Sequence, residues 1–368
     1  MTNKKQYLLT IIIPTFNEFE NVDKIIEKLK KVLYNKISYK IIFVDDNSND
    51  GTSDKIKQYQ KENSNIELIL RIGRRGLAGA CIEGIANSKS ELIAIMDCDL
   101  QHDENKIPEM VDLFNQSSEL DLVVGSRHTK DGISSTGFSK VRSYGSIIAT
   151  KITQILLRIK VSDPMSGFFM VRRKSIFTII QKLQPDGFKI LADIIACNRG
   201  KWVIKEIGYT FRKREAGNSK MNFSVLLELI ALIVSHLSFR YLSMRFVMFG
   251  MVGTSGIIVQ VLSTFILITF LDYNFIVSHF LSVMIAMTSN FTLNNIITFK
   301  DRSLRGYRYF KGLISFYVVC SAGAFLNIAS ADFLYKELEI WIISSIIGAF
   351  IGAIWNFLSS SIVTWKTR

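Results

Sequence analysis

The sequence predicts an α/β domain with a mostly parallel sheet, followed by a helical half that lies in a membrane. Two observations predict the α/β domain: short apolar runs alternate with amphipathic segments along residues 8–221, and polar residues follow most of the runs. The helical half is predicted by four apolar stretches after residue 245, each long enough to cross about 30 Å of hydrocarbon. Apolar residues make up 48% of the chain, which is high for a wholly soluble protein.

Apolar runs that end in a polar turn are expected to be the strands of the first part. The expected strands are residues 8–13, 39–44, 66–72, 92–96 and 122–124, with another after Met165–Phe169 and an alternating one over residues 202–211. Helices are expected between them, the first over residues 22–33, with Asn21 or Asp23 as its cap.

Two aspartates directly follow the fourth expected strand, as Asp97-Cys98-Asp99-Leu100-Gln101-His102. Open α/β sheets bind ligands beyond the carboxyl ends of their strands, so these carboxylates are expected at a ligand crevice. Oxygen ligands select a hard cation such as Mg²⁺ or Mn²⁺, which usually completes its shell with water and substrate phosphates. The residues alone leave open a solvated acidic turn instead of a metal–diphosphate site.

Further polar turns follow the second and third expected strands. Asp45 and Asp46 are either acceptors for a nucleotide's ribose or base, or an Asx turn that caps a helix. The Gly76/Gly79 turn is a candidate phosphate cradle at a helix start, with Arg74 and Arg75 beside it. Because no Walker loop and no Gly-x-Gly-x-x-Gly is present, an ordinary ATPase or dinucleotide site is disfavoured.

Seven short motifs occur in one order along residues 8–221. They are Pro14-x-Phe16-Asn17-Glu18, Asp45-Asp46-x-Ser48-x-Asp50-Gly51-Thr52, Gly76-Leu77, Asp97-x-Asp99-Leu100-Gln101-His102, Gly125-Ser126-Arg127, Met165-Ser166-Gly167-Phe168-Phe169 and Arg214-x-x-Gly217-x-Ser219-Lys220. The series resembles the family 2 glycosyltransferases of the GT-A fold. Within them it is most similar to the dolichol-phosphate mannose synthases and related polyprenyl-phosphate glycosyltransferases.

The resemblance implies a role for each matching position. It implies a nucleotide-sugar site, a metal site, a site for the acceptor's phosphate and residues that close the catalytic centre. The implied residues are Pro14, Phe16, Glu18, Asp46, Gly76 and Asp97 for the nucleotide sugar; Asp97, Asp99 and Gln101 for the metal; Arg127, Arg142 and Ser146 for the acceptor phosphate; and Asp99, Arg127, Arg214 and Lys220 for catalysis. Phe16 replaces a frequent Tyr and Cys98 replaces a small residue, which puts the choice of donor in doubt.

The second half is expected to hold four transmembrane helices, at about residues 246–271, 275–299, 312–335 and 340–365. Residues 222–244 are expected to be amphipathic helix in the membrane interface, with a buried core helix as the alternative. The domains are therefore predicted as 1–221, 222–244 and 245–368. The last resembles the GtrA-like membrane domains through Arg245-Phe246, Asn290-Phe291 and Thr298-Phe299, which bears on anchoring or on glycolipid transport.

Basic residues concentrate in the connection between the second and third spans and at the C-terminus. This pattern predicts that the catalytic domain and the C-terminus are cytoplasmic. The net charge of +13 is better explained by anionic membrane lipids than by nucleic acid.

The expected reaction is the transfer of mannose from GDP-mannose to dolichyl or another polyprenyl phosphate. A bound Mg²⁺ or Mn²⁺ is expected to neutralise the departing diphosphate, and the anionic acceptor phosphate is expected to attack directly, which inverts the anomeric centre. The alternatives are glucose or another hexose from a UDP-sugar, or translocation of a lipid-linked sugar by the membrane domain. A processive polysaccharide synthase is disfavoured because no Gln-x-x-Arg-Trp sequence is present.

Overall fold

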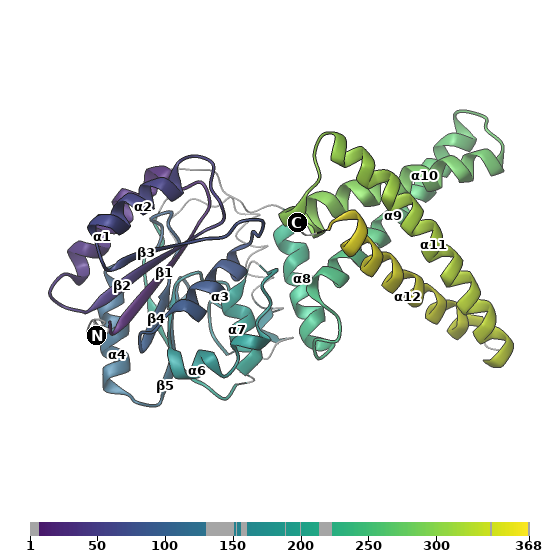
Figure 1. Ribbon diagram of the computed structural model, residues 1–368. Helices are drawn as coiled ribbons and strands as arrows, with labels where there is room; N and C mark the ends of the chain where they lie inside the picture. The colour runs from purple at the N-terminus through teal and green to yellow at the C-terminus, as the bar shows by residue number, and fades with distance from the viewer. Residues whose placement is uncertain are drawn as a thin grey trace, which may run out of the picture. The chain divides into compact units, whose positions relative to one another are not determined.

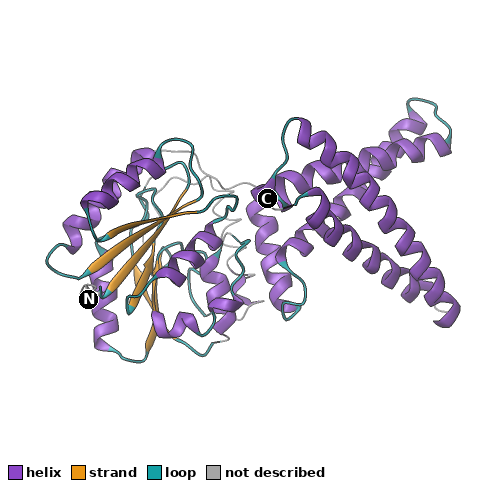
Figure 2. Cartoon of the chain, viewed as in Figure 1, coloured by secondary structure: helices purple, strands orange, loops and turns teal. Residues whose placement is uncertain are grey.

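The protein divides into two compact units, Met1–Tyr241 and Leu242–Arg368. The computed structural model describes residues 7–129, 151, 153–155, 160–187, 189–198, 200–212, 223–338 and 341–366. Among these residues the first unit holds every strand and the second is helical (Figures 1 and 2).

A seven-stranded sheet forms the centre of the first unit. Its strands are β1 (Leu9–Thr15), β2 (Tyr39–Asp45), β3 (Ile66–Leu70), β4 (Leu92–Ile95), β5 (Leu120–Ser126), β6 (Phe169–Arg172) and β7 (Val203–Gly208). Their spatial order is β3-β2-β1-β4-β6-β5-β7, and β6 alone runs antiparallel to its neighbours. The mostly parallel α/β class predicted from the alternating runs is therefore confirmed.

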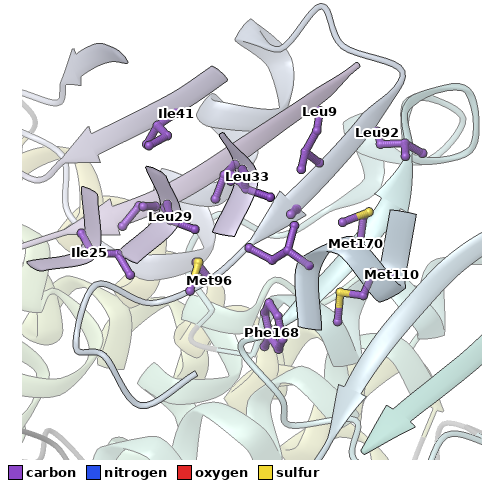
Figure 3. Packing of buried hydrophobic residues seen from close by; sticks show 14 of the residues in the cluster. Leu9, Ile25, Leu29, Leu33, Ile41, Leu92, Met96, Met110, Phe168 and Met170 are labelled. Carbon is purple, nitrogen blue, oxygen red and sulfur yellow. The ribbon is translucent and has the colours of Figure 1, made fainter. Parts of the chain in front are cut away.

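Helices cover both faces of this sheet (Figure 2), and strands β1 and β4 at its centre are fully buried. On one face pack α1 (Phe19–Leu33), α2 (Thr52–Glu62) and α4 (Lys106–Gln116). On the other pack α3 (Leu77–Asn87), α6 (Arg173–Phe177) and α7 (Ile190–Asn198). The apolar stripe of α1, with Ile25, Leu29 and Leu33, meets the strands in the core shown in Figure 3. Burial of this kind is the main stabilising contribution to such a domain.

The predicted cap of the first helix is wrong. Helix α1 begins at Phe19, so Asn21 and Asp23 lie within it rather than before it. Side chains of the neighbouring loop explain the earlier start, because Thr52 Oγ1 accepts from the Glu18 N–H (2.9 Å) and Asp50 Oδ2 from the Phe19 N–H (3.1 Å). These acceptors satisfy backbone N–H groups at the start of the helix, which a capping side chain would otherwise satisfy.

Polar contacts attach helix α8 (Phe223–Leu237) and the turn after it to α7 and to the segment before α7. His236 Nε2 lies 2.8 Å from Asp193 Oδ1, and Gln184 Nε2 donates to Ser235 Oγ at 2.6 Å. Arg240 donates to Cys197 Sγ at 2.7 Å and also pairs with Asp193. One face of α8 is thereby buried, while Leu226, Ile230 and Leu237 on the helix are exposed.

The second unit consists of helices α9 (Met244–Thr269), α10 (Phe275–Leu293), α11 (Tyr307–Leu338) and α12 (Trp341–Ser359). In the described residues, segments of α9, α10 and α11 are long and apolar enough to cross a membrane. Helix α12 occupies the position of the fourth predicted span, which stays a prediction. Helix α11 begins five residues before the expected start at residue 312, so Arg308 and Lys311 lie in its first turns.

Removing apolar volume from the core beneath α1 should destabilise the first unit. We expect Ile25→Ala to lower the free energy of unfolding by about 2–5 kcal/mol, because the fully buried Ile25 would leave a cavity. Chemical unfolding of the purified protein in detergent measures this change. The exposed Lys31→Ala on the same helix serves as the control, and an equal loss in both variants would contradict the packing assignment.

Candidate active site

Polar side chains collect at the edge of the sheet where the parallel strands end. Strands β1, β2, β4 and β5 all end at this edge, and the antiparallel β6 begins there, with Phe169 level with Ile95 and Val124. The motif residues that follow these strands are therefore brought together from distant parts of the chain, at the place where open α/β sheets bind ligands.

The turn after β4 holds Asp97 and Asp99 in fixed positions. The Asp97 N–H donates to His102 Nδ1 (3.1 Å), and the Gln101 N–H donates to Asp99 Oδ1 (3.1 Å). The His102 ring stacks on Phe168 at a centroid distance of 5.4 Å. Leu100 takes a positive φ of 63°, which closes the turn tightly. No role was predicted for His102 from the sequence. In the structure its ring supports the backbone of the acidic pair.

Gln101 links this turn to the segment after β7. Its Nε2 donates to the Arg212 carbonyl (3.0 Å), and the Arg212 N–H donates to the Gln101 carbonyl (2.9 Å). With the amide nitrogen used in this way, Oε1 is the atom of the side chain that can coordinate a cation. Asp97, Asp99 and Gln101 therefore offer an oxygen-only donor set, which fits Mg²⁺ or Mn²⁺ better than zinc.

A glycine makes room for the acidic pair. A Cβ on Gly167, in the turn before β6, would lie 2.9 Å from Asp97 Oδ2 and 3.2 Å from His102 Cε1. A side chain at position 167 would therefore displace the carboxylate or the imidazole.

The two aspartates after β2 have different surroundings. Asp45 is fully buried and accepts from Thr15 Oγ1, Ser48 Oγ and Ser53 Oγ, so it is a structural anchor of the turn. Asp46 forms an ion pair with Arg71 and accepts from the Gly76 N–H at 2.7 Å. Burial raises the pKa of Asp46 above its ordinary value, although Gly76 and Arg71 oppose that rise.

The Gly76 turn therefore differs from a bare phosphate cradle. Its Gly76 N–H, which the sequence suggested for a phosphate, is used by Asp46. Gly76 has φ of 134°, a conformation that favours glycine, and a Cβ on Gly79 would lie 2.5 Å from the buried Arg71. Arg75 instead reaches Phe16, with its guanidinium 4.5 Å from the ring centroid. Pro14 is buried in β1, and Glu18 precedes α1 at the same edge of the sheet.

Arg127, directly after β5, forms a two-pronged ion pair with Asp163. Its Nε and Nη2 donate to the two carboxylate oxygens at 2.7 and 2.9 Å, and its own N–H also reaches Asp163. Burial opposes the charge on each partner, but the hydrogen bonds prevail: the pKa of Arg127 is raised and that of Asp163 lowered. The remaining N–H groups of the guanidinium are the donors that an anion can use.

Lys189 lies in the same neighbourhood, at the start of α7, and the sequence reading missed it. Burial and the charge of Arg127 lower its pKa, while Asp97, Asp163 and Glu228 act in the opposite sense. The preceding loop is fastened to the Gly76 turn, because the Ala78 N–H donates to the Gly187 carbonyl at 3.2 Å. The only local signal was a single lysine before an apolar helix, which is too common to single out.

Four of the sequence-predicted site residues lie outside the described residues. These are Arg142, Ser146, Arg214 and Lys220. The others are brought to the one edge of the sheet described above.

Comparison with known proteins identifies both halves of the chain. Residues 10–179 match the model of glycosyl transferase family 2, and residues 248–365 match that of the GtrA/DPMS transmembrane domain. A dolichol-phosphate mannosyltransferase of Pyrococcus furiosus is 29% identical over 98% of this chain and 99% of its own. The enzyme of that name from Saccharomyces cerevisiae is 27% identical over 60% of this chain and 83% of its own.

Solved structures of the same fold include glucosyl-3-phosphoglycerate synthase of Mycobacterium tuberculosis. Its complex with Mg²⁺ and uridine diphosphate covers 63% of this chain and 80% of its own, with 15% identity and a TM-score of 0.50. This similarity shows the fold, and the family resemblance drawn from the motifs is confirmed by the family models. The chain is therefore a membrane-bound glycosyltransferase that carries a family 2 catalytic domain followed by a transmembrane domain of the GtrA/DPMS type.

Proposed function

We propose that this glycosyltransferase moves mannose from GDP-mannose to the phosphate of dolichol or a similar polyprenol. The observation that carries this proposal is the match to the Pyrococcus furiosus dolichol-phosphate mannosyltransferase along nearly the whole of both chains. A match of the catalytic half alone would support sugar transfer but not a lipid acceptor. The shared membrane half supports an acceptor that is itself in the bilayer.

The donor is proposed to bind along the ends of β1, β2 and β4. Phe16, Asp46 and the Gly76 turn would face the nucleotide, and Asp97, Asp99 and Gln101 would hold Mg²⁺ or Mn²⁺. When bound, this cation would neutralise the negative charge of the departing diphosphate. The oxygen-only donor set supports the cation, and the Phe16–Arg75 contact supports a flat, cationic surface for a nucleotide diphosphate.

The acceptor is proposed to bind at Arg127, together with Arg142 and Ser146. Arg127 is already oriented by Asp163, so little rearrangement is needed when the lipid phosphate arrives. A phosphate monoester is anionic at neutral pH and can attack the anomeric carbon without a strong general base. Direct displacement of the diphosphate inverts that carbon, and Arg214 and Lys220 are proposed to close the site over it.

The chain is proposed to cross the membrane four times, with the catalytic domain and the C-terminus in the cytoplasm. The basic connection at Lys300–Lys311 supports this orientation. The basic residues would contact anionic membrane lipids and no nucleic acid.

Mannose transfer can be tested in membranes that contain the protein and short-chain dolichyl phosphate. We expect radiolabel to pass into lipid from GDP-mannose in the presence of Mg²⁺ or Mn²⁺, and EDTA to abolish the transfer. The variant Asp99→Asn should reduce turnover by a factor on the order of 100 or more, because it removes a negative charge from the cation site.

Parallel reactions with UDP-glucose separate the donors. Label from UDP-glucose alone would keep the mechanism and replace the donor. If no donor in a wider panel gave metal-dependent label, the proposed enzyme function would be wrong.

The Arg127–Asp163 pair should govern the use of the acceptor. We expect Asp163→Asn to lower kcat/KM for dolichyl phosphate about 10- to 100-fold, because Arg127 would lose its ionised partner. Initial rates at varied acceptor concentration measure this loss. Asp54→Asn breaks the exposed pair with Lys57 and should change little. A wild-type KM for the acceptor in a folded Asp163→Asn protein would contradict the proposed site.

Lys189 is proposed to add positive charge where donor and acceptor phosphates meet. We expect Lys189→Gln to lower kcat/KM by about tenfold or more, and Lys189→Arg to restore part of the loss, because a charged hydrogen bond to phosphate is removed and then replaced. The exposed Lys182→Gln is the matched control. Equal activity of the two glutamine variants would exclude this role for Lys189.

A further inference from the structure

The ends of α10 and α12 have related sequences. Asn290–Lys300 reads NFTLNNIITFK and Asn356–Lys366 reads NFLSSSIVTWK, 66 positions later in the chain. Asn, Phe, Ile, Thr and Lys recur at five equivalent positions, and Phe299 is replaced by the aromatic Trp365. A match of this kind in two membrane helices goes beyond shared hydrophobicity, because polar residues recur in it.

The two segments also have the same unusual backbone. Each helix ends in a π-helical turn, Asn294–Thr298 after α10 and Ser360–Thr364 after α12. The Phe299 N–H donates to the Asn294 carbonyl at 2.8 Å, and the Trp365 N–H donates to the Ser360 carbonyl at 2.9 Å. Because π-helical turns are rare, two of them at equivalent places strengthen the relation.

The first helix of each pair carries a matching glycine. Gly256 of α9 lies against the carboxamide of Asn290, and Gly323 of α11 lies against that of Asn356. A Cβ on either glycine would overlap the asparagine side chain. In each pair of helices, one asparagine side chain therefore packs against one glycine, and these positions are equivalent between the two pairs.

Some of the aromatic contacts between the two pairs of helices are related by a two-fold exchange. With Gly256 aligned on Gly323, 67 positions later, Phe249 of α9 corresponds to Phe316 of α11. Phe291 corresponds to Phe357 at the offset of 66 given above. Exchanging equivalents turns the Phe249–Phe357 contact into the Phe316–Phe291 contact, and both have a centroid distance of 5.7 Å. Phe299 and Trp365 are each other's equivalents, and they stack at 4.3 Å with an interplanar angle of 9°. Reciprocal contacts of this kind characterise a two-fold interface.

We propose that the membrane unit consists of two copies of one helical hairpin, α9–α10 and α11–α12, which bind each other as the subunits of a symmetric dimer do. The aromatic surface of each hairpin thus binds a second copy of the same hairpin. Phe299 and Trp365 lie on the internal two-fold axis.

This arrangement has a consequence for the path through the membrane. Since Phe299 stacks on Trp365, the equivalent ends of the two hairpins lie together. In the proposed arrangement the two-fold axis runs along the hairpins, so both run in the same direction. If α9 and α10 cross the membrane, α11 and α12 cross it in the same sense. Asp272, after α9, then lies on the same side as Lys336, near the end of α11, and Arg305 lies on the opposite side.

Cysteine labelling tests this direction in the full chain. Single cysteines replace Asp272, Lys336 or Arg305, all of which are exposed, in a variant without the four native cysteines. Sealed vesicles are treated with a membrane-impermeant maleimide, and retained sugar transfer shows that each variant is folded. We expect Asp272 and Lys336 to label from one side and Arg305 from the other. Labelling of Asp272 and Lys336 from opposite sides would overturn the proposal.

The equivalence of the glycines can be measured by crosslinking. Thr264 and Ser282 join α9 to α10 with an Oγ–Oγ distance of 2.7 Å, and Ser315 and Thr364 join the second hairpin at 3.0 Å. Cysteines at either pair should form a disulfide on oxidation in membranes. We expect Gly256→Val to slow crosslinking in the first hairpin about tenfold, and Gly323→Val to do the same in the second, because each overpacks its contact.

Gly253→Val is the matched control, because a Cβ at Gly253 meets nothing within 4 Å. It should leave both crosslinking rates unchanged. If a valine variant fails to accumulate, Gly256→Ala and Gly323→Ala give a milder version of the same comparison. A large effect at one glycine and none at the other would contradict the repeat.

Discussion

The antiparallel strand β6 is the constraint on which the candidate site depends. It inserts between β4 and β5, so its entry turn must pass both strand ends at the crowded edge of the sheet. Asp163 and Gly167 lie in this turn, one against Arg127 and the other against Asp97. A parallel strand in this place would begin at the far edge. The direction of one short strand thus brings the proposed cation and acceptor sites together.

Charge pairing prepares both sides of the site before a substrate binds. Arg71 with Asp46 is a buried pair and Arg127 with Asp163 a partly buried one, and in each pair the charge of one residue is compensated by its partner. Burying one partner of an ion pair without the other would cost several kcal/mol. Each pair therefore holds its two side chains in place. Preoriented dipoles and charges of this kind need no reorganisation during a reaction, which suits a transfer whose difficulty is charge separation.

Local sequence patterns predicted the strands and the acidic turn. They did not predict which residues from other strands and loops pair with the residues of the site. Apolar runs marked β1, β2 and β4, and the spacing of Asp97 and Asp99 was visible in the sequence. The role of Arg71 was not visible, because it depends on Asp46, which follows a different strand. The prediction of the α1 cap failed for the same reason. Asp50 and Thr52, from a later loop, accept the hydrogen bonds of the N–H groups at the start of α1. The hairpin repeat was also missed, because its matching residues are sparse and its meaning appears only in the reciprocal contacts.

Departures from the two-fold relation explain how two similar hairpins adopt one arrangement. Asn295 Oδ1 accepts from Trp365 Nε1 at 3.0 Å and from the Leu304 N–H at 2.7 Å. Its equivalent, Ser361, donates instead to the carbonyl of Phe357 on its own helix. This difference follows from the chain, because the first hairpin must continue into the second and needs a polar side chain to turn the connection. The symmetric contacts thus favour the pairing of the hairpins. Asn295 in addition joins Trp365, on the proposed axis, to Leu304 in the connection between the hairpins.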